Sequence, residues 1–340
     1  MTIKHIVISG GGPTGLLSYG AAKYLEEQHF WSMDNIESIY GTSIGALFGV
    51  ILSLQHDWKT IDDYIIKCPW GEILQKNSTF HDVLDIYTNK GAMSDDFFDI
   101  IMKPLLLAKD LTLDVTLGEL HQFNKKEIHI MTVELNTFRL VNLSYKTHPS
   151  LKVMDAIKMS CAFPIIFSPK IVVETQNSDS DSKEGEGEDK GKGEDKGKGK
   201  GEGEGEGKGK GKGKKEECKR ICCYIDGGVI CNYPVNVCIE DQKCDPDEIL
   251  GFRNIWEKYN ETIDNNSSLV DFLKICVKQM IRKIEDEKSY VGIKNEVSCV
   301  SETTDYSSWF DLCLKESMRI QYIQRGMTYG EVFLRLVTKI

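Results

Sequence analysis

Residues 36–54 join a short apolar segment to a helical one through a serine flanked by glycines. Apolar residues from Ile36 to Tyr40 predict a buried strand, and from Ile44 onward they recur at helical spacing. The junction Gly41-Thr42-Ser43-Ile44-Gly45 is a G-x-S-x-G pattern in the strand–turn–helix setting of a nucleophile elbow. We expect Gly41 and Gly45 to be required, because a Cβ at either position would collide in so tight a turn. Ser43 would then lie at a helix N-terminus, which favours developing negative charge. The alternative is an ordinary serine cap between two glycines.

Composition limits the class of protein in which such a turn can occur. A chain of 340 residues that is 41% apolar can bury a large core, and its ordinary residue mix is typical of a soluble α/β enzyme. No apolar stretch is long enough to cross a bilayer and no signal peptide is apparent, so we expect an intracellular protein, cytoplasmic or peripherally membrane-associated. The eleven cysteines form no C-x-x-C pair, and we expect neither a metal nor a cofactor. The net charge of -10 argues against a nucleic-acid partner.

A glycine loop follows the first predicted strand, residues 4–9, and precedes a predicted helix, residues 16–28. The loop is Gly10-Gly11-Gly12-Pro13-Thr14-Gly15. It is not a Walker A loop, because Leu16-Leu17 stand where Lys and Ser/Thr are needed. A dinucleotide fingerprint is matched by Gly10, Gly12 and Gly15, but the ribose-binding acid should follow the second strand, where Ser43 stands. An oxyanion hole that faces Ser43 and is formed by Gly10, Gly11, Gly12 and Gly15 accounts for both loops.

Residues 57–147 are predicted to be mainly helical, with a pair of strands as an interruption, and a further helix and strand follow. His129 lies within one of these strands, and we expect it to be packed or outward-facing rather than catalytic. Apolar periodicity predicts helices at 58–66, 94–108 and 150–164, and strands at 126–135, 138–145 and 165–173, the first two joined at Asn136-Thr137.

Residues 175–217 differ in composition from everything around them. They are almost entirely Gly, Lys, Glu, Asp and Ser, with glycine at every second position from Gly197 to Gly213. Mixed charge and glycine cannot form a core, so we expect a disordered insertion within one domain. A role in shielding a site or binding a partner is the alternative.

A second candidate catalytic residue follows the insertion. A predicted strand at 221–225 ends in Asp226-Gly227-Gly228, so an aspartate stands where a strand stops. All seven histidines lie at or before His148, and the order of serine, acid and histidine cannot be completed after Asp226. A Ser43–Asp226 dyad is therefore the simpler assignment. A triad would need an earlier acid together with His81, His121, His129 or His148.

Taken together, these motifs resemble the patatin-like phospholipases, a family of lipid acyl hydrolases. The glycine loop, the serine elbow and Asp226-Gly227-Gly228 occur in the family's order, and Ser160-Cys161-Ala162-Phe163-Pro164 is similar to its segment before a core strand. The resemblance covers about residues 3–240. Two departures stand out, since Thr14 occupies a position where many members have Arg, and the insertion precedes the aspartate strand.

Fold and domain organisation are expected to follow the same pattern. We predict an α/β fold with a central, mostly parallel sheet flanked by helices in three layers, as one domain over residues 1–340. Residues 248–340 would complete it with strands at 248–256 and 296–301, a helix at 267–284 capped by Ser268, and a helix at 326–339. For the apolar face of the 267–284 helix we expect core packing rather than membrane docking.

The resemblance implies a serine acyl hydrolase of the phospholipase A or lysophospholipase type. Ser43 would attack a fatty-acyl ester to form an acyl-enzyme, Asp226 would act as the base, and Gly227 and Gly228 would support the turn. The expected partner is a lipid or membrane-surface substrate, and the oligomeric state stays open. Two other hypotheses remain: a catalytically silent lipid-binding homologue, and a dinucleotide-binding oxidoreductase that uses the loop at 10–15.

Overall fold

Parallel strands form the centre of the fold. The computed structural model describes residues 2–77, 90–94, 96–176, 218–256, 262–265, 267–301 and 311–338. Five parallel strands lie in the order β10-β9-β1-β2-β4. Their bounds are β1 (His5–Ile8), β2 (Ser38–Thr42), β4 (Glu127–Glu134), β9 (Ile249–Trp256) and β10 (Asn295–Ser301).

Antiparallel partners extend this sheet beyond β4. β5 (Arg139–Leu143) pairs with β4 as the predicted hairpin requires, with Glu134 opposite Arg139. β8 (Cys218–Asp226) also runs antiparallel to β4, with Asp226 opposite Thr132. A separate parallel pair is formed by β3 (Gly91–Met93) and β6 (Ile165–Phe167).

Contacts within the chain define two compact units. Residues 1–170 and 223–340 form the first, and residues 171–222 form the second. In the second unit, the structure describes most of β7 (Lys170–Gln176) and the first half of β8, which neighbour each other. The insertion predicted at 175–217 falls almost wholly outside the described residues, and so does His81.

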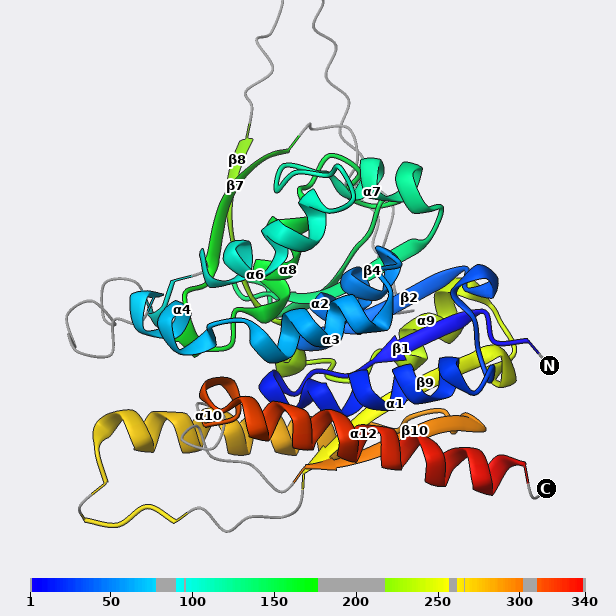
Figure 1. The fold of residues 1–340 in the computed structure, drawn as a ribbon. Helices are drawn as coiled ribbons and strands as arrows, with labels where there is room; N and C mark the ends of the chain where they lie inside the picture. The colour runs from blue at the N-terminus through cyan, green and yellow to red at the C-terminus, as the bar shows by residue number, and fades with distance from the viewer. Residues whose placement is uncertain are drawn as a thin grey trace, which may run out of the picture. The chain divides into compact units, whose positions relative to one another are not determined.

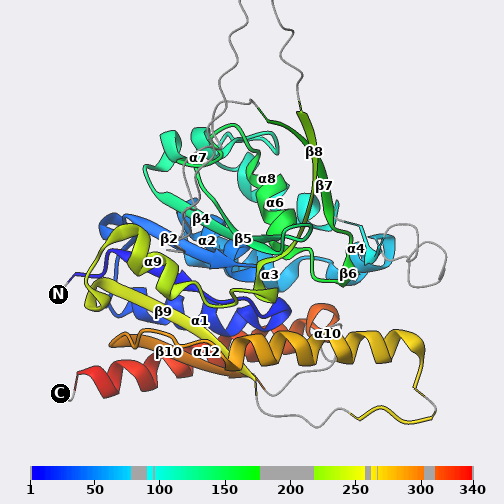
Figure 2. The same ribbon diagram turned by 180° about the vertical axis from the view of Figure 1, so that it is seen from behind.

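Helices cover both faces of the parallel strands (Figures 1 and 2). α1 packs on β9 and α12, α2 packs on β1 and β2, and α9 lies against the opposite face through a cluster that includes Val7 and Tyr40. The α/β fold with a mostly parallel sheet is therefore confirmed. Every helix in the described ranges is too short or too polar to cross a bilayer. The helices are α1 (Gly15–Glu27), α2 (Ile44–Ser53), α3 (Trp58–Lys67), α4 (Trp70–Asn77), α6 (Asp96–Leu107), α7 (Leu117–Asn124), α8 (Val153–Cys161), α9 (Val235–Gln242), α10 (Leu269–Asp286) and α12 (Glu316–Val337), with short 3-10 turns η1 (Gly12–Thr14), η2 (Met33–Asn35), η3 (Gly227–Val229) and η4 (Pro246–Glu248).

Two elements differ from the sequence prediction by more than a few residues at their ends. The single strand expected at 165–173 is divided into β6 and β7, because Pro169 lies between them and has no N–H to donate to a ladder. The last helix begins at Glu316 rather than at Gly326. Gly326 lies inside this helix because α12 crosses α1 so closely there that a Cβ would come within 2.2 Å of the Leu17 carbonyl oxygen. Helices α4 and α7 lie in the region 57–147 that was expected to be mainly helical, although their bounds were not predicted, and α9 was not predicted.

The apolar face of α10 is a further correction. Core packing was expected, yet Leu269 is 71% exposed and Met280 is 65% exposed, and Phe272 and Leu273 are exposed as well. The remaining members of the predicted face, Ile275, Cys276 and Val277, are half-buried. Apolar periodicity gives the direction of a face but not what covers it. The predicted cap is confirmed, since Ser268 and Asp271 form a reciprocal capping box at the start of this helix.

Candidate active site

The serine elbow has the tight geometry that its glycines predict. Ser43 links β2 directly to α2 with φ 55° and ψ -126°, a strained backbone conformation for a residue with a side chain. A Cβ on Gly41 would lie 2.6 Å from the Ala46 nitrogen, and one on Gly45 would lie 2.4 Å from the Ile8 carbonyl oxygen. Both glycines are therefore required by sterics, as expected from the sequence.

A buried serine on α8 holds the elbow in place. The backbone N–H of Ser43 donates to Ser160 Oγ at 2.8 Å, and Ser160 Oγ donates to the Met131 carbonyl on β4 at 2.6 Å. Ser160 is fully buried. The strained turn is thus tied to the neighbouring strand through one hydroxyl group.

Asp226 lies within hydrogen-bond distance of Ser43, although 183 residues separate them. Ser43 Oγ donates to Asp226 Oδ2 at 2.6 Å, and the Gly228 N–H donates to Asp226 Oδ1 at 2.7 Å. The pairing of β8 with β4 brings Asp226 beside the strand next to β2. Gly227 is needed at this turn, because a Cβ there would lie 2.3 Å from the Met131 carbonyl oxygen. Both members of the predicted pair therefore lie together in the structure.

Burial changes the acidity of this carboxyl group. Asp226 is 3% exposed, and burial raises its pKa to about 6, although the hydrogen bonds from Ser43 and Gly228 act in the opposite direction. A carboxylate with this pKa is still mostly ionised at neutral pH and is a stronger base than an ordinary aspartate. The site therefore offers a hydroxyl group next to an acceptor suited to proton transfer.

The glycine loop supplies fewer donors than the sequence predicts. The N–H of Gly10 donates to the Asn232 carbonyl at 3.0 Å, and the N–H of Gly15 donates within the η1 turn. These two glycines were predicted as oxyanion donors, and their amides are already engaged. Gly11 and Gly12 line the cavity that contains Ser43, and their N–H groups have no hydrogen-bond partner within the described residues.

Gly15 has a packing role instead. A Cβ at this position would lie 2.8 Å from Ile44 Cγ2 and 3.0 Å from the Phe48 ring. Its absence lets the start of α1 approach the start of α2. The glycine loop and the serine elbow are therefore adjacent, as the prediction of a common site requires.

Two residues anchor the glycine loop. Thr14, where many family members have Arg, is fully buried, and its Oγ1 donates to the Gly11 carbonyl at 2.7 Å. Asn254 on β9 donates from Nδ2 to the Gly10 carbonyl at 3.2 Å and accepts from Ser18 Oγ at 3.2 Å. The loop is held on one side by its own threonine and on the other by a neighbouring strand.

Ser160 and Asn254 were missed as site residues. Ser160 was noted only as part of the segment 160–164, although a serine on the buried side of an amphipathic helix is itself a signal. Asn254 is a polar residue within an otherwise apolar strand, close to the strand's carboxyl end, where ligands bind in open α/β sheets. Both signals indicate that these side chains lie near the site, but they do not identify the groups to which the side chains are hydrogen-bonded.

A large apolar cavity opens at Ser43 and Asp226. Its volume is about 740 Å³, and one wall contains Gly11, Gly12, Ser43 and Asp226. Apolar side chains from several helices and from β6 dominate the remainder, which suits a hydrocarbon chain rather than a polar cofactor. Among these side chains are Leu16, Ile44, Leu47, Phe48, Phe97, Phe98, Ile101, Phe163, Ile166 and Phe167.

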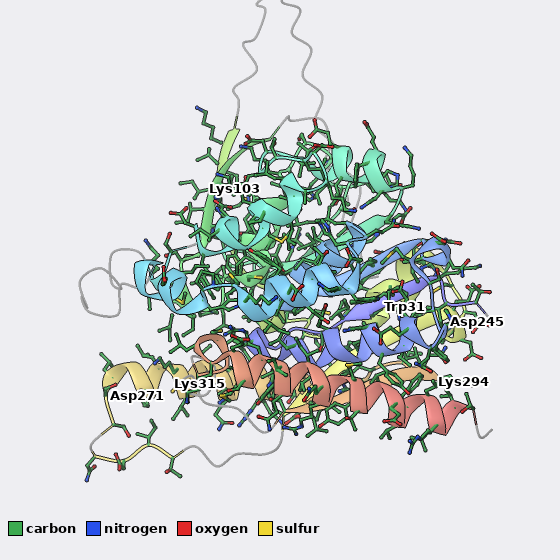
Figure 3. The ribbon with its side chains drawn as sticks, viewed as in Figure 1. Trp31, Lys103, Asp245, Asp271, Lys294 and Lys315 are labelled. Carbon is green, nitrogen blue, oxygen red and sulfur yellow. The ribbon has the colours of Figure 1, made fainter. Side chains whose placement is uncertain are left out.

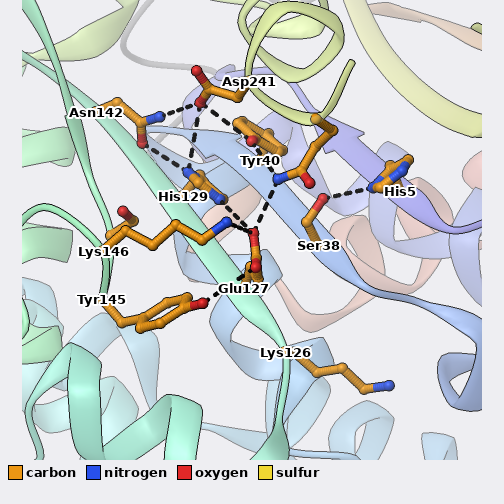
Figure 4. A network of polar contacts seen from close by, with 12 residues as sticks. His5, Ser38, Tyr40, Lys126, Glu127, His129, Asn142, Tyr145, Lys146 and Asp241 are labelled. Carbon is orange, nitrogen blue, oxygen red and sulfur yellow. Dashed lines mark hydrogen bonds and ion pairs between the residues drawn. The ribbon is translucent and has the colours of Figure 1, made fainter. Parts of the chain in front are cut away.

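The described histidines lie in other environments. His129 is buried and is hydrogen-bonded to Asn142 Oδ1 at 3.1 Å, with its ring stacked on Tyr40 (Figure 4). His121 stacks on Tyr145, and His148 contacts Thr147. No described histidine lines the cavity, and His129 is packed as expected. In the same described ranges no group of three His, Cys, Asp or Glu side chains could hold a metal ion.

Comparisons with known proteins identify a family for this chain. The family model described as patatin-like phospholipase matches residues 6–239. Uncharacterized protein YqhO of Bacillus subtilis is 26% identical over 174 residues, which are 48% of this chain and 56% of that protein. Probable lipid hydrolase 463L of Invertebrate iridescent virus 6 is 22% identical over 166 residues, which are 49% of this chain and 55% of that protein.

These matches cover only part of each protein. The chain spans about half the length of the curated relatives it matches. Among solved structures, VipD from Legionella pneumophila aligns with 95% of this chain and 67% of its own, at 14% identity and a TM-score of 0.45.

Proposed function

Because the chain belongs to the patatin-like phospholipase family, we propose that it is a lipid acyl hydrolase in which Ser43 is the nucleophile and Asp226 the general base. The observation that carries this proposal is the 2.6 Å hydrogen bond from Ser43 Oγ to Asp226 Oδ2 at the wall of an apolar cavity of about 740 Å³. The proposed substrates are fatty-acyl esters of phospholipids or related lipids.

Acylation is the first half of the proposed reaction. Asp226 Oδ2 takes the Ser43 hydroxyl proton as Oγ attacks the ester carbonyl carbon. The carbonyl oxygen becomes an oxyanion, which the N–H groups of Gly11 and Gly12 would hold. When the carbon–oxygen ester bond breaks, Asp226 gives its proton to the departing alcohol oxygen. Ser43 is left esterified to the fatty acid.

Hydrolysis of this ester completes the cycle. A water molecule gives a proton to Asp226 as its oxygen attacks the acyl carbon. The same two amides would hold the second oxyanion. Cleavage of the bond to Ser43 Oγ releases the fatty acid, and the proton on Asp226 returns to the serine. The chain's own residues thus supply the nucleophile, the base and the oxyanion donors.

Turnover of a soluble ester tests the proposal most directly. We expect the purified protein to hydrolyse p-nitrophenyl butyrate and Ser43→Ala to fall to the uncatalysed rate. Ser53→Ala is the matched control, because Ser53 is a buried serine at the far end of the helix that follows Ser43, and its Oγ donates to the Val50 carbonyl within that helix. Equal turnover by wild type and Ser43→Ala would refute the assignment of the nucleophile.

Covalent labelling separates the proposal from its alternatives. A fluorophosphonate should label wild type and Ser53→Ala but not Ser43→Ala. Bound lipid without labelling or turnover would indicate a catalytically silent lipid-binding homologue. A flavin or nicotinamide absorbance in the purified protein would instead indicate an oxidoreductase. A panel of phospholipids, lysophospholipids and neutral glycerides then identifies the ester that is cleaved.

A further inference from the structure

The helix α10 presents apolar side chains to solvent. From Leu269, apolar residues recur three, four, seven and eleven positions along the helix, and these positions share one face. Four of them are exposed: Leu269 by 71%, Phe272 by 48%, Leu273 by 44% and Met280 by 65%. Exposed apolar side chains that are contiguous on one helix mark an interaction surface rather than a scatter of surface residues. We call these four residues the α10 face.

The helix extends beyond the strands beneath it. In Figures 1 and 2 the N-terminal half of α10 runs past the ends of β9 and β10, and in Figure 3 Asp271 marks this projecting end. The capping box of Ser268 and Asp271 fixes the helix start there. The α10 face is thus carried on a defined helix that projects from the sheet.

The C-terminal half of α10, which carries Met280, also contributes to the site. Ile281 packs against the cluster of Val133, Ile225 and Val229, which lies next to Asp226. Ile281 and Arg282 also line the cavity that contains Ser43. The α10 face therefore reaches, at Met280, the part of the helix that forms a wall of the cavity.

Basic residues are concentrated in the middle of this helix, whose ends carry Asp271, Glu285 and Asp286. Between Asp271 and Glu285 the sequence has four basic residues, Lys274, Lys278, Arg282 and Lys283, and no acidic one. The chain as a whole has a net charge of -10, so this segment departs from its surroundings. Apolar residues on one face with Lys and Arg on the remainder are the composition of a helix that lies in the plane of a membrane interface. Arg282 and Lys283 line the cavity, and Lys283 pairs with Glu287 at 3.1 Å. Lys274 and Lys278 lie outside the cavity lining, and each would add about 1 kcal/mol of attraction near an anionic leaflet.

We propose that α10 docks the protein onto an anionic lipid surface, with the α10 face inserted among the acyl chains. The helix rises about 16 Å from Leu269 to Met280, which suits a helix lying flat in the interface rather than one that spans it. Docking itself does not depend on turnover. Docking would place the cavity beside the bilayer, so that a lipid could enter the cavity directly from the membrane. This consequence of docking rests on the proposed function.

Vesicle flotation tests the docking. All proteins carry Ser43→Ala so that the lipid is not consumed. We expect this full-length protein to bind vesicles of equal parts phosphatidylcholine and phosphatidylglycerol, to bind pure phosphatidylcholine more weakly, and to lose part of its binding in high salt. Adding Phe272→Asp and Met280→Asp should weaken binding at least about a hundredfold, which is what the loss of two buried apolar side chains implies.

A second helix offers the matched control. Val332 and Leu336 on α12 are 49% and 63% exposed, and Val332→Asp with Leu336→Asp should leave vesicle binding unchanged. Melting curves establish that each variant is folded. Equal loss of binding in the α10 and α12 variants would overturn the proposal. So would a change from dimer to monomer on α10 substitution without any vesicle binding, which would assign the α10 face to a second copy of the chain.

Soluble-ester turnover distinguishes this proposal from the proposed function. With Ser43 intact, Phe272→Asp and Met280→Asp should hydrolyse p-nitrophenyl butyrate at the wild-type rate, because neither residue lines the cavity. Their hydrolysis of vesicle lipid should fall with binding. Vesicle binding without ester turnover in any form would leave docking intact and refute the hydrolase. Ester turnover with no vesicle binding would refute docking and leave the proposed hydrolase activity intact.

Discussion

Ser160 Oγ lies between the backbone N–H of Ser43 and the carbonyl of Met131, at 2.8 Å and 2.6 Å. This hydroxyl therefore accepts from the strained elbow and donates to the central sheet. The position of the Ser43 side chain depends on a residue that takes no part in the proposed proton transfer.

Ser160→Ala should lower kcat strongly while the protein stays folded. Without the hydroxyl, the buried Ser43 N–H and Met131 carbonyl lose their partner, which costs about 1 to 3 kcal/mol of stability. The elbow can then shift, and we expect kcat for p-nitrophenyl butyrate to fall about ten- to a hundredfold with little change in KM. Steady-state kinetics measures both constants.

Ser53→Ala controls for lost stability alone. It removes a buried serine hydroxyl from α2 at the end distant from the elbow, where Ser53 Oγ donates to the Val50 carbonyl. A similar fall in melting temperature with unchanged kcat is expected. If Ser53→Ala and Ser160→Ala lost the same fraction of kcat, a positioning role for Ser160 would be wrong.

Asp226→Asn should remove turnover and stabilise the fold. Burial raises the pKa of Asp226 from 3.8 to about 6, so at neutral pH the native state contains a carboxylate that is less favourable there than in the unfolded chain. Such a difference corresponds to about 3 kcal/mol against folding. Part of it is recovered by an amide, and we expect the free energy of unfolding to rise by about 1 to 3 kcal/mol at pH 7.5. Loss of the base should cost about two to four powers of ten in kcat.

The stabilisation should disappear in acid. A group whose folded pKa is raised loses stability as pH rises from 3.8 to about 6, because the unfolded chain releases its proton first. Wild type and Asp226→Asn should therefore converge in stability near pH 4 and differ fully above pH 6.5. Urea unfolding at several pH values measures this. A variant less stable than wild type at every pH would contradict the cost assigned to the buried charge.

The pH profile of kcat/KM should have an acidic limb near pH 6. Asp226 accepts a proton only when it is ionised, so the rate should fall about tenfold for each pH unit below that value. Free imidazole titrates close to the same pH, and the limb alone does not distinguish the two groups. Its temperature dependence does, because imidazole ionisation has the larger enthalpy. A limb that moves to lower pH on warming would indicate histidine.

His129→Gln tests whether a histidine, rather than Asp226, is the general base. His129 is buried on β4 and bonded to Asn142, away from the cavity, so we expect lower stability with turnover within a few-fold of wild type. A folded His129→Gln protein as inactive as Asp226→Asn would restore a triad.

Thr14→Val should weaken oxyanion stabilisation. It keeps the shape of a fully buried residue and removes the Oγ1 donor to the Gly11 carbonyl. Since the loop would act on the transition state, kcat should fall about three- to tenfold while KM stays constant. Thr14→Ser keeps the hydroxyl and should retain most of the rate. Equal rates for Thr14→Val and wild type would show that Asn254 alone suffices to hold the loop.

The parts of the site that sequence predicted are those fixed by local sterics. Gly41 and Gly45 are read from a five-residue pattern because each would collide with backbone if it had a side chain. The Asp226 turn could be matched to Ser43 from the order of the motifs and the resemblance. The distance between them depends on the pairing of β8 with β4, which no local pattern encodes.

The errors concern partners that lie far away in sequence. Gly10 was predicted as a donor, but its N–H is taken by Asn232, more than two hundred residues further along the chain. The apolar face of α10 has the same periodicity whether protein or lipid covers it, so the spacing of Leu269 and Phe272 could not predict their exposure. Sequence patterns give local geometry and amphipathicity, whereas the choice of partner is a tertiary property.

The amide of Gly228 makes the two oxygens of Asp226 inequivalent. Oδ1 accepts that N–H at 2.7 Å, and Oδ2 faces the serine hydroxyl at 2.6 Å. An oxygen that accepts an amide hydrogen is poorly placed to carry a hydrogen of its own. In the proposed reaction, the proton therefore arrives and departs through Oδ2 without rotation of the carboxyl group. Whichever ester bond is cleaved, its departing oxygen must therefore reach that one atom of Asp226, which restricts the orientation in which a lipid can react.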